Sequence, residues 1–325
     1  MPATVTHAYF ANDLYDILPI GLKKLLIDDK LKLRMFAQST DPLLFYNLLV
    51  KKDKKIRDFQ SYFHTNKSQE FFINLINYIK YNKYYQNKDV MAFLYGFISH
   101  YILDAKLHPF IIYKSGFYNK DDINTYKYRN KHEYMENFID NYMIKQKENI
   151  TPYNFKFYDF CFDLTPFSKE LEEVINYTFK ETFNIENFST YYYKSLKSMY
   201  YSLKYLRYDK YGIKMFLYKL VDKISKKDAF KLQAVSYHVS LKDKYNYLNL
   251  NHKIWYHPTL KKEKHQESFI ELYSIALHDA LKTIKDVNSY IKDTKKINLK
   301  HTFKNLSYLS GKNCNNKNNF KYFEF

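Results

Sequence analysis

The sequence predicts an all-α fold built from many helices, and two observations carry this prediction. Apolar residues recur at the three- and four-residue spacing of an amphipathic helix along most of the chain. Only five Gly and seven Pro occur in 325 residues, so few positions would break a helix. A chain of this length can bury a large core as one domain. We therefore expect a single multi-helix domain over residues 1–291.

The helices can be placed in chain order. An early helix with Asn12-Asp13 as its cap is interrupted at Pro19, because proline cannot continue the helical hydrogen-bond pattern. Ser68 is expected to cap a helix whose apolar stripe runs from Phe71 to Ile79. A turn is expected at 41–42, and a loop over 108–129, where Pro109 ends or kinks the continuation of the preceding helix. Further helices are expected over 88–107, 132–148, 168–187, 191–208, 213–224, 227–240 and 266–291.

The last part of the chain, residues 292–325, has a different composition. It is rich in Lys and Asn, and from Ile291 onward eight Lys stand against only Asp293 and Glu324. Segments with high charge and few apolar residues do not bury enough surface to fold. We expect a poorly ordered basic tail after the helical domain.

The whole chain is strongly basic, with 52 Lys and Arg against 34 Asp and Glu and a net charge of +18. A basic surface favours anionic partners, either a phospholipid membrane or nucleic acid. The abundance of Lys, Asn, Tyr and Ile is also typical of an A+T-rich coding sequence. The charge alone therefore does not choose between these partners.

Segments that direct a chain to or across a membrane are not visible in the sequence. The first residues, Met1 to His7, have neither a basic stretch nor an apolar stretch of the kind found in secretory signals. No run reaches the roughly 18 apolar residues that span a bilayer. We expect a protein of the cytoplasm or the periphery of a membrane.

The most informative motif lies in the apolar segment that starts at Val90. His100, Asp104 and His108 are spaced i, i+4 and i+8, which places them in one column of a helix. Buried imidazoles and carboxylates need partners, and a metal ion is a common one. The same spacing recurs at His132 and Glu136. With only two cysteines, the sequence predicts neither a disulfide framework nor a thiolate metal site, so the metal would be held by His and carboxylates, as suits zinc.

The ligand-type residues occur in the order His…Asp…His…HisxxxAsp…His…HisxxxGlu, which resembles the signature of the bacterial zinc-dependent phospholipase C family. The residues that carry this resemblance lie within Thr6-His7-Ala-Tyr-Phe-Ala, Ala37-Gln-Ser-Thr-Asp41-Pro, His64, Gly96-xxx-His100-xxx-Asp104-xxx-His108-Pro109 and His132-xxx-Glu136. The motifs cover about residues 5–140.

The resemblance implies an all-α domain that holds a cluster of two or three Zn²⁺ ions. One zinc would be held by Asp41, His64, His100 and Asp104. Asp104 would bridge to a second zinc that also uses His7, and the third would be held by His108, His132 and Glu136. Asp41 lies at the position that is also discussed as a general base, so we assign it a catalytic role.

One departure from the family concerns the His7 site. Secreted members complete it with the amino group and carbonyl of an N-terminal Trp, whereas Trp255 is the only Trp in this chain. Removal of Met1 would leave the amine of Pro2 about five residues from His7, and that amine is a candidate replacement.

The resemblance implies a zinc-dependent phosphodiesterase that hydrolyses phospholipid to diacylglycerol and a phosphorylated headgroup. The sequence has no Ser or Cys nucleophile motif and no Gly-rich phosphate loop. Attack by metal-bound hydroxide is the mechanism that needs the fewest further residues. The partner would be a phospholipid substrate or membrane surface rather than nucleic acid.

Two alternatives stay open. Single-strand-specific zinc nucleases have a similar helical zinc cluster, but they typically show HisxxxAsp at the last ligand pair, so Glu136 favours the phospholipase. The other alternative is a non-catalytic, zinc-stabilised helical protein associated with a membrane through its basic tail.

Overall fold

The computed structural model describes residues 4–48, 50–150, 154–207, 209–225, 231–237, 242–316 and 319–324. It is 67% helical, so the all-α prediction is confirmed. One small antiparallel sheet pairs β1 (Trp255–His257) with β2 (Leu260–His265). In the part of the chain that is described, no helix is both long enough and apolar enough to cross a bilayer.

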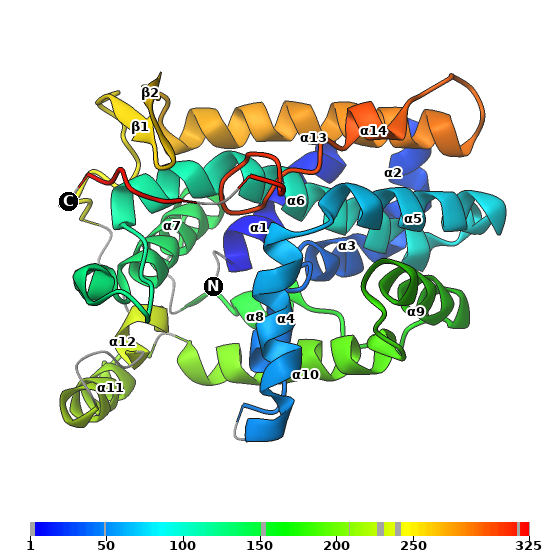
Figure 1. Ribbon diagram of the computed structural model, residues 1–325. Coiled ribbons are helices and arrows are strands. Elements are labelled where there is room, and N and C mark those ends of the chain that lie inside the picture. The colour runs from blue at the N-terminus through cyan, green and yellow to red at the C-terminus, as the bar shows by residue number, and fades with distance from the viewer. Residues whose placement is uncertain are drawn as a thin grey trace.

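The longest helix, α6 (Lys88–Ser115), lies at the centre of the fold, and Figure 1 shows α13 (Phe269–Ile291) running alongside it. Almost every residue of α6 is buried, as expected for a helix that is apolar on all sides. The other α-helices are α1 (Thr4–Ile17), α2 (Ile20–Leu26), α3 (Lys30–Phe36), α4 (Lys54–Thr65), α5 (Ser68–Tyr81), α7 (Lys131–Glu148), α8 (Phe157–Cys161), α9 (Lys169–Phe183), α10 (Phe188–Leu206), α11 (Ile213–Ile224), α12 (Leu232–Val235) and α14 (Leu299–Thr302). Short 3₁₀ helices are η1 (Ile27–Asp29), η2 (Asp41–Phe45), η3 (Lys51–Asp53), η4 (Tyr84–Gln86) and η5 (Ile123–Tyr128).

The helix does not end at Pro109, and the first part of the loop predicted over 108–129 is wrong, because α6 continues through Pro109 to Ser115. Phe110, Ile111 and Ile112 are buried, and their packing outweighs the hydrogen bond that the proline removes. The backbone of Gly311, in the C-terminal segment, packs against α6 beside Pro109. Gly311 approaches so closely that a Cβ on it would lie 2.3 Å from the carbonyl oxygen of Ala105, the carbonyl that Pro109 cannot pair.

Helix starts also differ from the predictions. The first helix begins at Thr4 rather than at Asn12, because its capping group comes from Asp140 in α7. Pro19 does separate α1 from α2, as expected. Ser68 is the first residue of α5, and its hydroxyl donates to the carbonyl of Leu306 instead of capping the helix. In the expected helix 227–240 only α12 is helical among the described residues, and residues 226–230 and 238–241 lie outside them.

The C-terminal segment differs from the poorly ordered tail that its composition suggests. In the described residues 292–316 and 319–324, Phe303 and Tyr308 are fully buried, and the Phe303 ring stacks on Phe72. Near the end of the chain, Glu324 forms an ion pair of 2.8 Å with Lys114, which is itself buried. A few well-spaced apolar and charged anchors therefore order a segment whose average composition is polar.

Candidate metal centre

The eight predicted ligands come from five elements and meet around the middle of α6. His7 comes from α1, Asp41 from η2 and His64 from α4, while the three-residue column lies on α6 and the HisxxxGlu pair on α7. They form three groups in which the ligand atoms all lie within 4.8 Å of one another. The groups are His7, Asp41 and His100; His64, His100 and Asp104; and His108, His132 and Glu136.

The first two groups share His100, and Asp104 of the second group also faces His7 of the first. One carboxylate oxygen lies 3.1 Å from Nε2 of His7, and the other lies 2.9 Å from Nε2 of His100 and 3.5 Å from Nε2 of His64. His64 also approaches Asp41, with 3.3 Å between Nε2 and Oδ1. A single carboxylate thus faces three imidazoles, which is the arrangement that a bridging ligand requires.

The third group is formed across α6 and α7. Oε1 of Glu136 lies 2.9 Å from Nε2 of His132 and 3.5 Å from Nε2 of His108. The side chain of His132 is 23% exposed, whereas the other seven candidate ligands are buried. The centre is therefore most open to solvent at the end of α7 that carries His132.

Gly96 determines how closely α6 approaches α3. A Cβ at Gly96 would lie 2.6 Å from Cβ of Phe36, so only glycine permits this contact. One turn later, Nδ1 of His100 lies 2.8 Å from the carbonyl oxygen of Ala37. Because a carbonyl only accepts hydrogen bonds, Nδ1 of His100 must donate, and Nε2 is directed toward Asp104.

His64 is oriented in the same way by its own helix. Its Nδ1 donates to the carbonyl of Gln60 at 2.9 Å, and the side-chain amide of Gln60 donates to Oδ1 of Asp41 at 2.7 Å. Gln60 thus supports two candidate ligands at once. Its position at i−4 of His64 is the only sequence signal that could have indicated this role.

Tyr308 is the supporting residue that sequence reasoning missed entirely. Its amide donates to the carbonyl of His64 at 2.8 Å, and its own carbonyl accepts from Nδ1 of His108 at 2.8 Å. Its ring centroid lies 4.7 Å from that of His64. No sequence pattern marks it, because the contacts are made mainly by backbone atoms.

Asp140, one turn beyond Glu136, supports α1 rather than acting as a ligand. Its carboxylate accepts hydrogen bonds from the amides of Val5 and Thr6 at 3.0 and 2.8 Å, from the Thr6 hydroxyl at 2.7 Å, and from the hydroxyl of Tyr237 at 2.9 Å. These amides belong to the first turn of α1, where backbone donors lack helical partners. Asp140 thereby fixes the start of the helix that presents His7.

The carboxylates and imidazoles shift each other's proton affinities. Burial raises the pKa of a carboxyl group, yet the imidazoles of His100 and His64 lower the pKa of Asp41 to about 2. Burial lowers the pKa of a histidine, yet Asp104 and Asp41 raise the pKa of His64 to about 10. For His7 burial prevails, together with the neighbouring His100, and its pKa is lowered. Asp41 is therefore ionised at neutral pH.

The donor set fits a divalent metal such as zinc. Imidazole nitrogens and carboxylate oxygens are the ligands that zinc takes in the absence of thiolates. Within the described residues, the ion pairs of Asp41 and Asp104 are all with histidine, so no Lys or Arg neutralises them there. A void of about 10 Å³ lies among residues that include His7, Asp104, His108 and Glu136. That is room for an atom-sized occupant.

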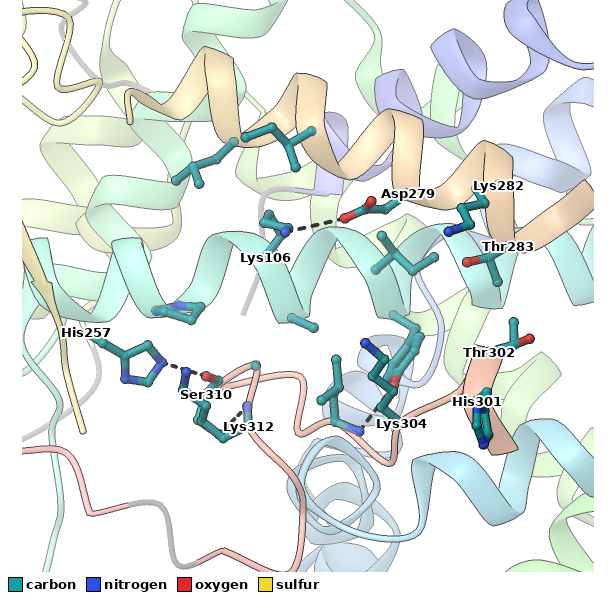
Figure 2. Close-up of a pocket in the computed structure, with 18 of the residues that line it drawn as sticks. Lys106, His257, Asp279, Lys282, Thr283, His301, Thr302, Lys304, Ser310 and Lys312 are labelled. Carbon is teal, nitrogen blue, oxygen red and sulfur yellow. Dashed lines mark hydrogen bonds and ion pairs between the residues drawn. The ribbon is translucent and has the colours of Figure 1, made fainter. Parts of the chain in front are cut away.

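A much larger groove, of about 720 Å³, lies elsewhere and contains none of the eight ligands. It is bounded by the other face of α6, by α13 and by the C-terminal segment, and Figure 2 shows Lys106 and Asp279 facing each other across one side of it. Elsewhere along the groove the carbonyl of Ser310, in the loop that follows Tyr308, accepts from Nε2 of His257 at 2.9 Å. The C-terminal segment and α6 therefore lie between this groove and the candidate metal ligands.

The His7 group contains no tryptophan among the described residues. Trp255 is buried in β1, where its ring stacks on His265, so it does not replace the N-terminal Trp. The Pro2 amine lies outside the described residues. Within them, the buried Nδ1 of His7 has no hydrogen-bond partner.

Comparison with known protein families gives a match. A family model described as zinc dependent phospholipase C matches residues 6–189, which is more than half of the chain and includes all eight candidate ligands. No curated protein and no solved structure gives a significant match. The matched range ends within α10, so α11, α13 and the C-terminal segment lie beyond it.

Proposed function

Since the chain belongs to the zinc-dependent phospholipase C family, we propose that it is a phosphodiesterase that hydrolyses phospholipid to diacylglycerol and a phosphorylated headgroup. The observation that carries the proposal is Asp104, whose two carboxylate oxygens face His7, His64 and His100 in the buried interior. A structural zinc site needs four ligands at most. Eight converging ligands with a shared carboxylate are better suited to a multi-metal catalytic centre.

Two or three zinc ions would be distributed over three positions. Asp41, His64, His100 and Asp104 would hold the first, and Asp104 would share the second with His7. The third would be held by His108, His132 and Glu136. When bound, such ions lower the pKa of a coordinated water to about 7 and polarise phosphoryl oxygens.

Asp41 is the residue proposed to move a proton. Its carboxylate is ionised at neutral pH because its pKa is lowered, and Gln60 holds Oδ1 by a hydrogen bond of 2.7 Å. Oδ2 is then the oxygen that would accept a proton from the attacking water. The phosphoester would approach past His132, since that ligand is the most exposed.

The experiment is hydrolysis of a short-chain, water-soluble phosphatidylcholine by the full-length protein supplied with zinc. Diacylglycerol and phosphocholine are the expected products. Asp41→Asn is expected to lower kcat by at least about 100-fold, the scale of a lost general base. Asp58→Asn is the matched control, because Asp58 lies on the solvent side of α4 and pairs only with Lys54 among the described residues.

Other outcomes would redirect the assignment. Cleavage of single-stranded DNA without cleavage of lipid would indicate a nuclease. Bound zinc without turnover of lipid, nucleic acid or a simple phosphodiester would indicate a metal-stabilised scaffold. Lipid hydrolysis that survives removal of zinc would contradict the proposal.

A further inference from the structure

Helix α11 presents an apolar face to solvent instead of to the core. Six of its twelve residues are large apolar side chains that are between 46% and 87% exposed. They are Ile213, Phe216, Leu217, Leu220, Val221 and Ile224. Single exposed apolar residues are common on protein surfaces, but a contiguous patch marks an interaction site.

These six residues share one side of the helix. Their spacing from Ile213 is i+3, i+4, i+7, i+8 and i+11, which is the pattern of a single stripe. A stripe of this kind ordinarily packs against the protein interior. On α11 the orientation is reversed, so the helix is amphipathic with its apolar side outward.

The orientation is fixed by the polar side of the helix. Asp222 is the buried residue of α11, and its carboxylate accepts from the amides of Leu232 and Gln233 at 2.8 and 3.0 Å. The side-chain amide of Gln233 adds a third bond at 2.9 Å. These bonds attach α11 to α12 and leave the opposite, apolar face outward. Figure 1 shows the two short helices together at the periphery of the fold.

The charges that border the stripe are positive. Lys214, whose Nζ donates to the carbonyl of Tyr205 at 2.8 Å, lies along one edge, and the exposed Lys219 and Lys223 lie along the other. The acidic residue of α11 is the buried Asp222, so the outward face carries no negative charge. An apolar face bordered by lysines is complementary to the acyl chains and phosphates of an anionic phospholipid surface.

The helix also lies near the open side of the metal ligands. The amide of Lys231, just before α12, donates to Oδ1 of Asn130 at 3.0 Å, and α12 packs on α7. Asn130 is the residue before α7, the helix that carries the exposed His132. A surface bound by α11 would therefore lie beside the end of α7 where the centre is most open.

From these observations we infer that α11 docks the protein on an anionic phospholipid surface, with Phe216 and its apolar neighbours inserted among the acyl chains. The inference deepens the proposed function and rests on it, since the docked surface would be the source of the substrate. It also concerns a part of the chain that lies beyond the family match.

The test is co-sedimentation of the full-length protein with vesicles of phosphatidylglycerol and phosphatidylcholine, and with vesicles of phosphatidylcholine alone. The test variant is Ile213→Asp with Ile224→Asp. The matched control is Ile20→Asp with Ile123→Asp, because those side chains are 74% and 77% exposed and the change in charge and apolar area is the same. Thermal unfolding of each variant checks that it is folded.

We expect the wild type to bind anionic vesicles at least tenfold more strongly than neutral ones. The test variant should lose at least tenfold of this binding, and the control should stay within twofold of the wild type. A second, conservative variant reports insertion directly. Phe216→Trp should shift its emission to the blue on anionic vesicles and be quenched by lipids brominated in the acyl chain, while the buried Trp255 gives a constant background.

The inference is overturned if the wild type does not bind anionic vesicles, if the test variant binds like the control, or if the emission of the Phe216→Trp variant does not respond to them. Hydrolysis of the short-chain soluble lipid keeps the two proposals apart. All variants should retain it, because none of the changed residues is a candidate ligand. If the wild type does not hydrolyse this lipid, the proposed function is contradicted. The results of vesicle binding test only the docking surface.

Discussion

The carbonyl oxygen of Tyr308 lies 2.8 Å from Nδ1 of His108, although 200 positions separate the two residues. The amide of the same Tyr308 donates to the carbonyl of His64. One residue of the C-terminal segment therefore contacts candidate ligands from two of the three groups. Hydrogen bonds of this kind fix the tautomer and direction of a metal-ligating imidazole, and their loss typically costs about 10- to 100-fold in metal affinity.

Gly311 provides a test of this C-terminal contact. Gly311→Ala would place a Cβ 2.3 Å from the carbonyl of Ala105, so the loop that carries Tyr308 must shift. Gly212→Ala is the matched control, since Gly212 also has a positive φ but no atom within 4 Å of the added Cβ. Both substitutions carry the cost of placing alanine at a positive φ. In addition to that cost, Gly311→Ala should destabilise the protein by about 1–3 kcal/mol through overpacking. The zinc affinity of Gly311→Ala should fall, whereas that of Gly212→Ala should not. Thermal unfolding and zinc titration measure the two effects. If both variants give the same results, the contact is not important.

A second prediction concerns the contact between α6 and α3. Gly96→Ala adds a Cβ 2.6 Å from Phe36 and should cost about 1–3 kcal/mol of unfolding free energy. The displaced backbone of Ala37 should also weaken zinc binding through His100. Gly21→Ala in α2 meets no atom within 4 Å and should stabilise the protein by up to about 1 kcal/mol. Denaturant unfolding of the two variants measures the contrast, and a tolerated Gly96→Ala would refute the importance of this close packing.

The third prediction concerns the cap of α1. Asp140→Ala leaves the buried amides of Val5 and Thr6 without their acceptor, which should cost about 2 kcal/mol or more. Asp209→Ala removes a comparable carboxylate from the start of α11, where it accepts from the amide of Ile213 at 2.7 Å. That half-buried cap should be worth about 1 kcal/mol. Zinc bound through His7 should be weakened only by Asp140→Ala; similar zinc content in both variants would contradict the role of Asp140.

The fourth prediction follows from the raised pKa of His64. With a pKa of about 10 in the metal-free protein, His64 carries a proton at pH 7, and zinc must displace it. Zinc binding should therefore release protons at pH 7, and its affinity should rise with pH up to about 10. Calorimetry in two buffers of different ionisation enthalpy counts the protons. The count should fall in His64→Ala and stay unchanged in His278→Ala, whose side chain lies on the exposed side of α13; no release in the wild type would contradict the prediction.

The same histidine links pH to the stability of the metal-free protein. Because its folded pKa exceeds the ordinary value of 6.5, its contribution to stability is complete below about pH 6.5 and is lost as the pH rises toward 10. In the zinc-loaded protein His64 would bind zinc instead of this proton, so its contribution to stability would not be lost by the same titration. The metal-free protein should therefore lose stability between these pH values more steeply than the zinc-loaded protein.

The parts of the structure that the sequence predicts are those with a local signal. The column of His100, Asp104 and His108 follows from helical spacing, and the helix over 213–224 is found with the predicted bounds. Periodicity could not indicate that the stripe on this second helix faces outward, because the same spacing serves a core and a membrane. That orientation depends on Asp222 and its hydrogen bonds to residues ten and eleven positions later.

Contacts between distant segments were not predictable in this way. Asp140 caps a helix that begins 136 positions earlier in the chain, and Tyr308 contacts its partners through backbone atoms, which leave no residue preference. The buried tail was missed for a related reason. Its average composition is polar, and Phe303 and Tyr308 supply the anchoring contacts that composition averages away.

The most direct test of the central claim is the zinc content of the purified protein by mass spectrometry, with hydrolysis of a chromogenic phosphocholine ester measured before and after chelation. We predict two or three zinc ions per chain, loss of both zinc and hydrolysis on chelation, and recovery of both when zinc is restored. Asp104→Asn should lower zinc content and turnover together, while Asp279→Asn on the surface of α13 should change neither. A protein that binds no zinc, or one that hydrolyses the ester equally well without it, would contradict the account.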